Sequence, residues 1–151
     1  MSSHRRAGAV LPAGSWNVVD ALDSISLDHD HRHRRRLLLA SAQGHAILLD
    51  LARATRLRED DGLLLDDGAI IRVRAKPEAL LAITAPDAHT LLRLAWHLGN
   101  RHLPVQILPQ ELRIAADHVI AEMVRGLGGS ACDITAAFDP EAGAYAGGHD
   151  H

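Results

Sequence analysis

The first half of the chain alternates short apolar runs with turn residues. Between residues 16 and 76 these runs are rich in Leu, Ile and Val, and none keeps a helical period, so the pattern predicts strands. The predicted strands are Val18–Val19, Ser24–Leu27, Arg35–Ala40, His45–Asp50, Gly62–Leu65 and Ala69–Val73. Asp66-Asp67-Gly68, between the last two runs, is a strong hairpin signal. We therefore expect a small all-β domain over residues 1–76.

The pattern changes at Lys76-Pro77. Ala79–Ala85 reads as a strand, and a helix is predicted to follow it, with Thr84 as the N-cap and Pro86 in the first turn. Gly99 is a natural end for this helix. The positions that recur at helical spacing are Leu91, Leu92, Ala95 and Leu98.

Two short strands, a second helix and a final strand complete the predicted elements. The strands are Val105–Leu108, Glu111–Ile114 and Ala131–Phe138. The apolar face of the second helix is formed by Val119, Ile120, Met123, Val124 and Leu127. The order βαββαβ is that of the ferredoxin-like split βαβ arrangement. We expect an α+β protein with a ferredoxin-like domain over residues 77–146, followed by a short histidine-containing tail at 147–151.

Composition excludes several classes of protein. The chain has 151 residues, 47% of them hydrophobic and 23% charged, which is typical of a globular protein. No apolar run approaches the roughly 20 residues that span a bilayer, and no long apolar stretch follows the polar N-terminus, so we expect neither membrane insertion nor secretion. Cys132 is the only cysteine, which excludes an internal disulfide and favours a small buried side chain. A formal charge of −3 gives no support for nucleic-acid binding, and a cytoplasmic location fits best.

Histidine is over-represented, with 11 residues against four aromatic ones. Imidazole is a good ligand for Ni²⁺, Cu²⁺ and Zn²⁺. His29, His31 and His33 alternate, so an extended backbone would place all three on one face. A solvated charged turn between two strands is the favoured interpretation, because the neighbouring arginines would repel a cation. His149 and His151 form a second group at the C-terminus, with an auxiliary role in metal contact.

Three further histidines are placed where the fold brings two helices to one face of a sheet. His97 lies on the first predicted helix, His102 just beyond its end, and His118 at the start of the second helix beside Asp117. Polar capping residues are the alternative interpretation of each position. Recognisable catalytic motifs are missing from the sequence, so the residues alone indicate a two-domain protein with excess histidine.

Several segments resemble a known family. They are Trp96-His97-Leu98-Gly99-Asn100-Arg101-His102-Leu103-Pro104-Val105-Gln106-Ile107, Asp117-His118-Val119-Ile120, Gly126-Leu127-Gly128 and Phe138-Asp139-Pro140-Glu141-Ala142-Gly143-Ala144-Tyr145. Together they resemble the UreE family of nickel metallochaperones, the urease accessory proteins. The first half is similar more loosely, through His31–Arg36 and the hairpin at Asp66-Asp67-Gly68.

The resemblance implies a homodimer in which His102 lies on the two-fold axis and offers one imidazole from each subunit to a shared Ni²⁺. It implies peripheral ligands at His97 and His118, with the tail residues His149 and His151 in support, and Zn²⁺ or Cu²⁺ as alternatives at the same histidines. It further implies that the N-terminal domain docks partners, and that the urease accessory GTPase and apo-urease receive the metal. The family is not enzymatic. Some relatives have a histidine where this chain has Ala116, and many end in a longer histidine-rich tail. These differences concern the number of extra ions and not the site at His102.

Two other functions stay open. A passive storage or buffering protein would bind Ni²⁺, Zn²⁺ or Cu²⁺ mainly through its tail and His29–His33. A metal-dependent hydrolase would need a general base beside an open coordination position on the metal. Asp117 is the only acid near the candidate histidines that could act as this base, which argues against a hydrolase.

Overall fold

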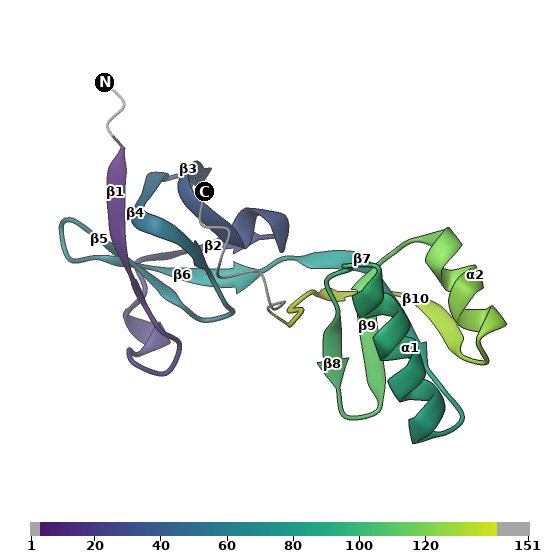
Figure 1. Ribbon diagram of the computed structural model, residues 1–151. Helices are drawn as coiled ribbons and strands as arrows, with labels where there is room; N and C mark the ends of the chain where they lie inside the picture. Colours follow the sequence, from purple (N-terminus) through teal and green to yellow (C-terminus); the bar gives the residue numbers. More distant parts are fainter. Residues whose placement is uncertain (1–3, 142–151) are drawn as a thin grey trace. The chain divides into compact units, whose positions relative to one another are not determined.

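The computed structural model of the chain describes residues 4–141. These residues form two compact units, one ending at Lys76 and the other beginning at Pro77, and each is described by itself (Figure 1). No helix within the described range is long and apolar enough to cross a membrane.

The N-terminal unit is a single six-stranded sheet with the order β2-β6-β5-β1-β4-β3. Its strands are β1 (Arg5–Leu11), β2 (Asp23–Leu27), β3 (His33–Ala40), β4 (Ala46–Arg56), β5 (Gly62–Leu65) and β6 (Ile70–Ala75). Most neighbours are antiparallel, but β1 pairs with β4 and β2 with β6 in parallel. The inward positions form one core that includes the fully buried Ile47, Leu49, Leu63 and Ile71. The predicted all-β organisation of this half is confirmed.

Two details of the N-terminal prediction are wrong. The first strand, β1, was not predicted, because its arginines, small residues and glycine form no apolar run, and Ala7 alone fills the space against the core. Val18–Val19 is not a strand but part of a 3₁₀ turn, η1 (Val18–Asp20), in which the Asn17 side chain accepts from the backbone N–H of Val19. The short polar side chain of Asn17 favours this local turn over an extended backbone.

A buried carboxylate links the two edge strands of the six-stranded sheet, β2 and β3. Asp23, at the start of edge strand β2, is bonded by the Ser41 hydroxyl and by Nδ1 of His45 at 2.8 Å, both from the turn between β3 and β4. Burial raises the pKa of Asp23, but the hydrogen bonds from Ser41, His45 and the backbone N–H groups of Ser24 and Gln43 outweigh it and lower the pKa to about 2. The ionised Asp23 carboxylate thus holds edge strand β2 to the turn that follows the other edge strand, β3.

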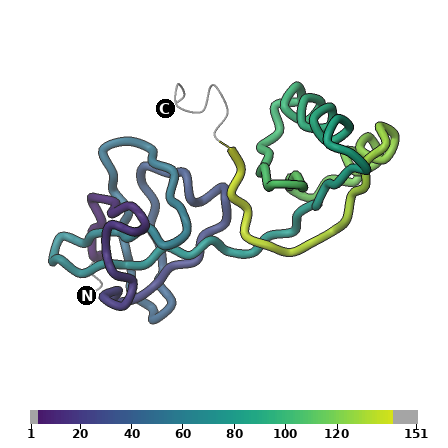
Figure 2. The backbone as a smooth tube through the Cα atoms, turned by 90° about the horizontal axis from the view of Figure 1, so that it is seen from below, coloured from purple at the N-terminus to yellow at the C-terminus, as the bar shows by residue number. Residues whose placement is uncertain are grey.

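The C-terminal unit is an antiparallel four-stranded sheet with the order β10-β7-β9-β8 and two helices. The elements are β7 (Pro77–Thr84), α1 (Ala88–Asn100), β8 (Gln106–Leu108), β9 (Glu111–Ala115), α2 (His118–Gly126) and β10 (Ser130–Ala137). Figures 1 and 2 both show α1 and α2 on one face of this sheet. Leu94, Leu98, Ile120 and Val124 pack there against the sheet residues Leu81, Ile83, Leu112 and Ile114. The predicted ferredoxin-like βαββαβ topology, and with it the α+β class, is confirmed.

The ends of α1 differ from the prediction. Asp87, not Thr84, is the N-cap, and its carboxylate accepts from the backbone N–H of Thr90 at 2.7 Å. The helix continues through Gly99 to Asn100, because the residue that turns the chain out of the helix lies further on, at His102.

Three side chains also differ from expectation. Leu92 is 70% exposed rather than on the buried face of α1 with Leu98. Val119 is 58% exposed rather than part of the apolar face of α2. Cys132 is exposed on edge strand β10, where only one side of the strand is covered, rather than buried.

Candidate metal-binding site

His102 lies in a backbone conformation that favours glycine. Its φ is +60°, in the left-handed region, where a Cβ crowds the following carbonyl. Its N–H donates to the carbonyl of Gly99 at 3.0 Å, and the N–H of Leu103 donates to the carbonyl of Leu98 at 3.3 Å. These two bonds form a Schellman motif with Arg101 as the C-cap and His102 at the position after it, which glycine usually occupies. The side chain of His102 is exposed, so packing does not explain a histidine at a position that glycine usually occupies.

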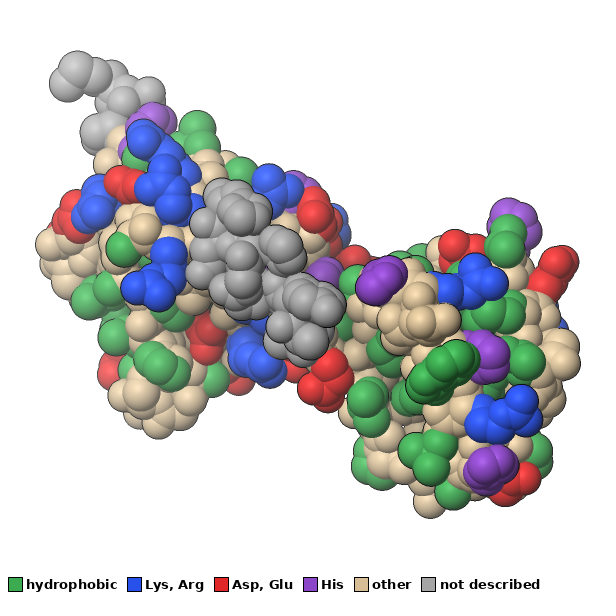
Figure 3. All heavy atoms as spheres, viewed as in Figure 1, with side chains coloured by type: hydrophobic (Ala, Val, Ile, Leu, Met, Phe, Trp, Pro, Cys, Tyr) green, Lys and Arg blue, Asp and Glu red, His purple; other side chains and the backbone are tan. Residues whose placement is uncertain are grey.

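The outward face of α1, just before His102, is unusually apolar. Leu92 is 70% exposed and Trp96 is 65% exposed, one turn apart and opposite the buried Leu94 and Leu98. The Trp96 ring stands edge-on to the His97 imidazole, with 5.0 Å between the ring centroids. Figure 3 shows hydrophobic and histidine side chains side by side in this region. A large aromatic side chain in solvent beside a polar loop is typical of a protein–protein contact.

His118 begins α2, which starts at the same end of the sheet as the last turn of α1. The N-cap Asp117 accepts from the backbone N–H groups of Val119 at 2.9 Å and Ile120 at 3.2 Å. One oxygen of this carboxylate is thereby engaged in capping, whereas the exposed His118 imidazole has no such restraint. His118 therefore remains accessible as a ligand.

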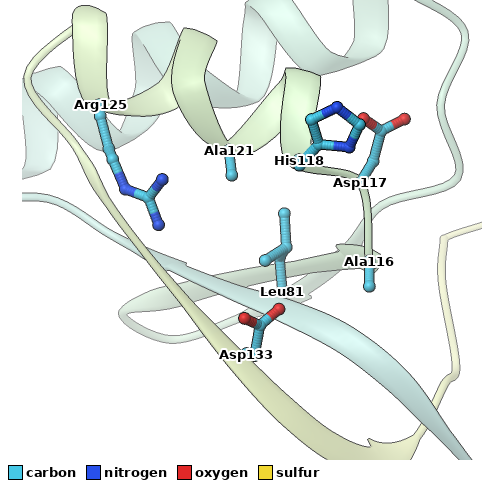
Figure 4. A pocket seen from close by; sticks show the side chains of 7 residues that line it. All are labelled: Leu81, Ala116, Asp117, His118, Ala121, Arg125 and Asp133. Atoms are coloured by element: carbon cyan, nitrogen blue, oxygen red, sulfur yellow. The ribbon is translucent and has the colours of Figure 1, made fainter.

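A hollow of about 380 Å³ opens beside His118. Its lining consists of Leu81, Ala116, Asp117, His118, Ala121, Arg125 and Asp133. In Figure 4, Leu81 and Ala121 point toward one another across it, with Arg125 on one side and the Asp117–His118 pair on the other. Arg125 also donates to the carbonyl of Ala131 at 3.1 Å, which holds its cation at the rim. The Arg125 cation disfavours a metal ion inside the hollow, whereas the carboxylates of Asp117 and Asp133 in its lining favour one.

The structure does not assemble the predicted histidines into one closed site. Within residues 4–141, no group of three or more His, Cys, Asp or Glu side chains is placed to hold a single metal ion. His97, His102 and His118, all within the described residues, therefore form no common ligand set in one chain. A tight site at any of them requires ligands from outside the described residues of a single chain.

The histidines near residue 30 are not on one face. Residues Asp30–Arg32 form a 3₁₀ turn, η2, so the extended backbone that would align His29, His31 and His33 is absent there. Nδ1 of His31 lies 2.7 Å from an oxygen of Asp28, which also accepts the backbone N–H of His31. That backbone bond, together with the ring, lowers the pKa of Asp28 despite its partial burial. The turn expected between the two strands is thus confirmed, and the alternative of an extended segment with one shared histidine face is wrong, because Asp28 accepts from the backbone of His31 and favours the turn.

His149 and His151 lie outside the described residues. The described chain ends beside the His102 loop: the N–H of Glu141 donates to the carbonyl of Val105 at 2.8 Å, and the N–H of Asp139 to Oε1 of Gln106 at 3.1 Å.

Comparison with known proteins identifies the family. Residues 6–76 match the model "UreE urease accessory protein, N-terminal domain", and residues 78–151 match the model of the C-terminal domain of the same proteins. The chain belongs to the UreE family of urease accessory proteins. Proteins named urease accessory protein UreE from Rhodopseudomonas palustris HaA2 and Bradyrhizobium sp. BTAi1 are 58% and 54% identical over 86% and 93% of this chain. The UreE of Rhodobacter capsulatus is 45% identical over the whole chain and 96% of its own length.

The chain spans only part of some relatives. It covers 60% of the length of the Rhodopseudomonas protein and 68% of the Bradyrhizobium one. The family resemblance read from the sequence is thus confirmed, and a role in urease maturation follows from it. Sequence reasoning alone missed two features of the site, the left-handed backbone of His102 and the exposed Trp96. The spacing of Leu92 and Trp96, on the opposite side of α1 from Leu94 and Leu98, was the signal available for the second feature.

Proposed function

We propose that this UreE-family chain is a nickel-binding metallochaperone, not an enzyme, that delivers Ni²⁺ for assembly of the urease active site. The observation that carries the proposal is the left-handed histidine at the end of α1. A strained backbone that glycine would relieve is retained where the side chain itself has a role, and an exposed imidazole is a nickel ligand.

The ion is shared between two copies of the chain. A single exposed His102 offers one imidazole, and no three-ligand group exists within residues 4–141 of one chain. A two-fold axis through His102 doubles the ligand without any further residue. The exposed Leu92 and Trp96 supply the apolar surface that such a homodimer buries.

An ion held by two imidazoles keeps open coordination positions, which suits transfer to another protein. His97 and His118 act as peripheral ligands at the same side of the unit. His149 and His151 complete the set. His149 follows Glu141 by eight positions, enough chain to span up to about 28 Å from the point where Glu141 is anchored to Val105. Zn²⁺ and Cu²⁺ compete for the same nitrogens.

The two units divide the work. Residues 77–146 bind metal and dimerise, residues 147–151 form the auxiliary tail, and residues 1–76 dock the partners, which are the urease accessory GTPase and apo-urease. The site of action is the cytoplasm, where urease is assembled.

Passive metal storage is the second candidate function. It is less well supported than delivery, because storage would rely on His29, His31 and His33, and the 3₁₀ turn at Asp30–Arg32 keeps these histidines from sharing one face.

Urease activation at limiting nickel tests delivery. Purified apo-urease with its accessory proteins is mixed with the wild-type chain, His102→Ala, or a chain ending at Ala146, each loaded with the same amount of Ni²⁺. We expect His102→Ala to abolish the gain in activation and the truncation to reduce it only partly. Equal activation by His102→Ala and wild type contradicts delivery through His102.

A further inference from the structure

The outward face of the N-terminal sheet carries an apolar pair that crosses two strands. Leu38 of β3 is paired in register with Leu48 of β4, and both point away from the core that their neighbours Leu39 and Ile47 enter. Leu38 is 57% exposed. The next pair toward the hairpin, Ala40 with Ala46, is also apolar, so the two pairs form one continuous patch.

Arginines border this patch on both sides. Arg6 of β1 is in register with Leu48, and Arg36 lies two residues before Leu38 on the same face of β3. We call Arg6, Arg36, Leu38, Leu48 and Asp50 the Leu38 face. Arg35, the residue without a register partner at the irregularity between Arg34 and Arg36, adjoins this face, and its charge acts on Asp50. Figure 3 shows basic and hydrophobic side chains together in the region of β1, β3 and β4.

The arginines of this region are not equally engaged. Arg6 is held between Asp50 at 3.1 Å and Asp66 at 3.0 Å, and its guanidinium lies where a Cβ of Gly8 would be. Arg35 and Arg36 are exposed, and in the described part of the chain they make no side-chain hydrogen bond or ion pair. Their charges act on Asp50 only from a distance, where they help Arg6, the main cause, to lower its pKa. Two guanidinium groups beside Leu38 therefore keep their full capacity for carboxylates.

The net charge of the N-terminal unit also favours an acidic partner. Residues 4–76 contain twelve basic and ten acidic side chains, whereas residues 77–141 contain four basic and eight acidic ones. The positive excess lies in the unit that carries the Leu38 face.

We infer that the Leu38 face docks an acidic amphipathic surface of a partner protein in urease maturation, an inference that rests on the proposed function. An apolar side chain of the partner covers Leu38 and Leu48, and carboxylates beside it pair with Arg35 and Arg36. Nucleic acid fits less well, because the centre of the face is the apolar pair of Leu38 and Leu48, which a phosphate backbone would not cover. A membrane fits less well because the apolar patch is two residue pairs wide.

Binding of the purified complex of apo-urease with its accessory GTPase tests the inference. The variants are Leu38→Ser and the double change Arg35→Glu with Arg36→Glu, both at exposed positions, with folding checked by circular dichroism. Val19→Ser is the matched apolar control, since Val19 is 79% exposed on η1. Arg74→Glu is the matched charge control, because Arg74 lies on β6 and pairs with Glu59.

We expect the double arginine variant to weaken binding by about tenfold or more and Leu38→Ser by about fivefold, with both controls unchanged. Wild-type affinity should fall with added salt, because exposed charges are screened. Nickel binding and dimer mass should stay at wild-type values in all these variants, whereas His102→Ala should lose nickel and keep partner binding.

Wild-type affinity in both Leu38-face variants overturns the inference and leaves the proposed function intact. Equal losses in the variants and the controls overturn it too. So does binding to phosphatidylglycerol vesicles or duplex DNA that depends on Arg35 and Arg36 while binding to the urease complex does not. If the wild-type chain docks the urease complex through the Leu38 face but delivers no nickel, the proposed function fails and the inference about docking stands.

Discussion

Replacing His102 by glycine should stabilise the fold while removing the nickel site. A left-handed backbone costs a residue with a Cβ about 1–2 kcal/mol, and His102 has a φ of +60°. Glycine removes this cost but loses about 0.5–1 kcal/mol more conformational entropy on folding. The imidazole is exposed, so little packing is lost with it. The net expectation is a gain of about 0.5–1 kcal/mol in the free energy of unfolding.

Two further variants make this prediction specific. Asparagine tolerates the left-handed region better than alanine, so the order of stability should be His102→Gly, then His102→Asn, then His102→Ala. The assay is thermal unfolding of the metal-free chain at one fixed concentration with a chelator present, because both nickel and dimerisation would shift the midpoint. For a domain of this size, a gain of 1 kcal/mol raises the midpoint by about 4–8 °C. A glycine variant no more stable than the alanine variant would show that the backbone at His102 is not strained, and the argument from strain to function would fail.

Three other changes test the surrounding account. Asp23→Asn should remove about 2 kcal/mol of acid-sensitive stability from the N-terminal unit, because the folded pKa of about 2 lies below the ordinary value. This contribution is complete above about pH 4 and is lost as the pH falls through 2, so in urea unfolding the difference between variant and wild type should shrink at pH 2.5 to about a third of its size at pH 6. Gly129→Ala should destabilise the C-terminal unit by about 1–3 kcal/mol, because a Cβ there would lie 2.6 Å from Cδ1 of Leu94 and 2.9 Å from Cγ1 of Val124. Gly99→Ala, where a Cβ would have nothing within 4 Å, is the control and should be neutral or stabilising. Equal losses of stability for the two variants in urea unfolding would contradict this packing. Trp96→Arg should convert the dimer to a monomer, measured as molecular mass by light scattering at micromolar concentration, whereas the control Val19→Arg should stay dimeric. A Trp96→Arg variant that remains a dimer would exclude the α1 face as the interface.

The fold was largely readable from the sequence. Short apolar runs and the Asp66-Asp67-Gly68 turn predicted the N-terminal sheet, and two amphipathic stretches between strands predicted the ferredoxin-like half. What failed depended on contacts distant in sequence. Strand β1 exists because Ala7 fits against the core between β4 and β5, which no local pattern of Arg5–Leu11 could reveal.

The candidate site was readable in its residues but not in its geometry. Similar segments pointed to His102, yet Gly99 looked like the natural end of α1, and only the hydrogen bonds to Gly99 and Leu98 place the left-handed residue at His102. For His29, His31 and His33 the sequence favoured a charged turn but left an extended shared face open. The backbone N–H of His31 donates to the Asp28 carboxylate, and this local bond favours the 3₁₀ turn.

The number of Ni²⁺ ions held per dimer tests the central claim most directly. Native mass spectrometry and titration calorimetry should be carried out on the full chain, on His102→Ala and on a chain ending at Ala146. We predict one tightly bound ion per wild-type dimer, its loss in His102→Ala and its retention, with lower affinity, in the truncated chain. A tight ion that survives His102→Ala but disappears on truncation would contradict the account and assign the metal to the tail.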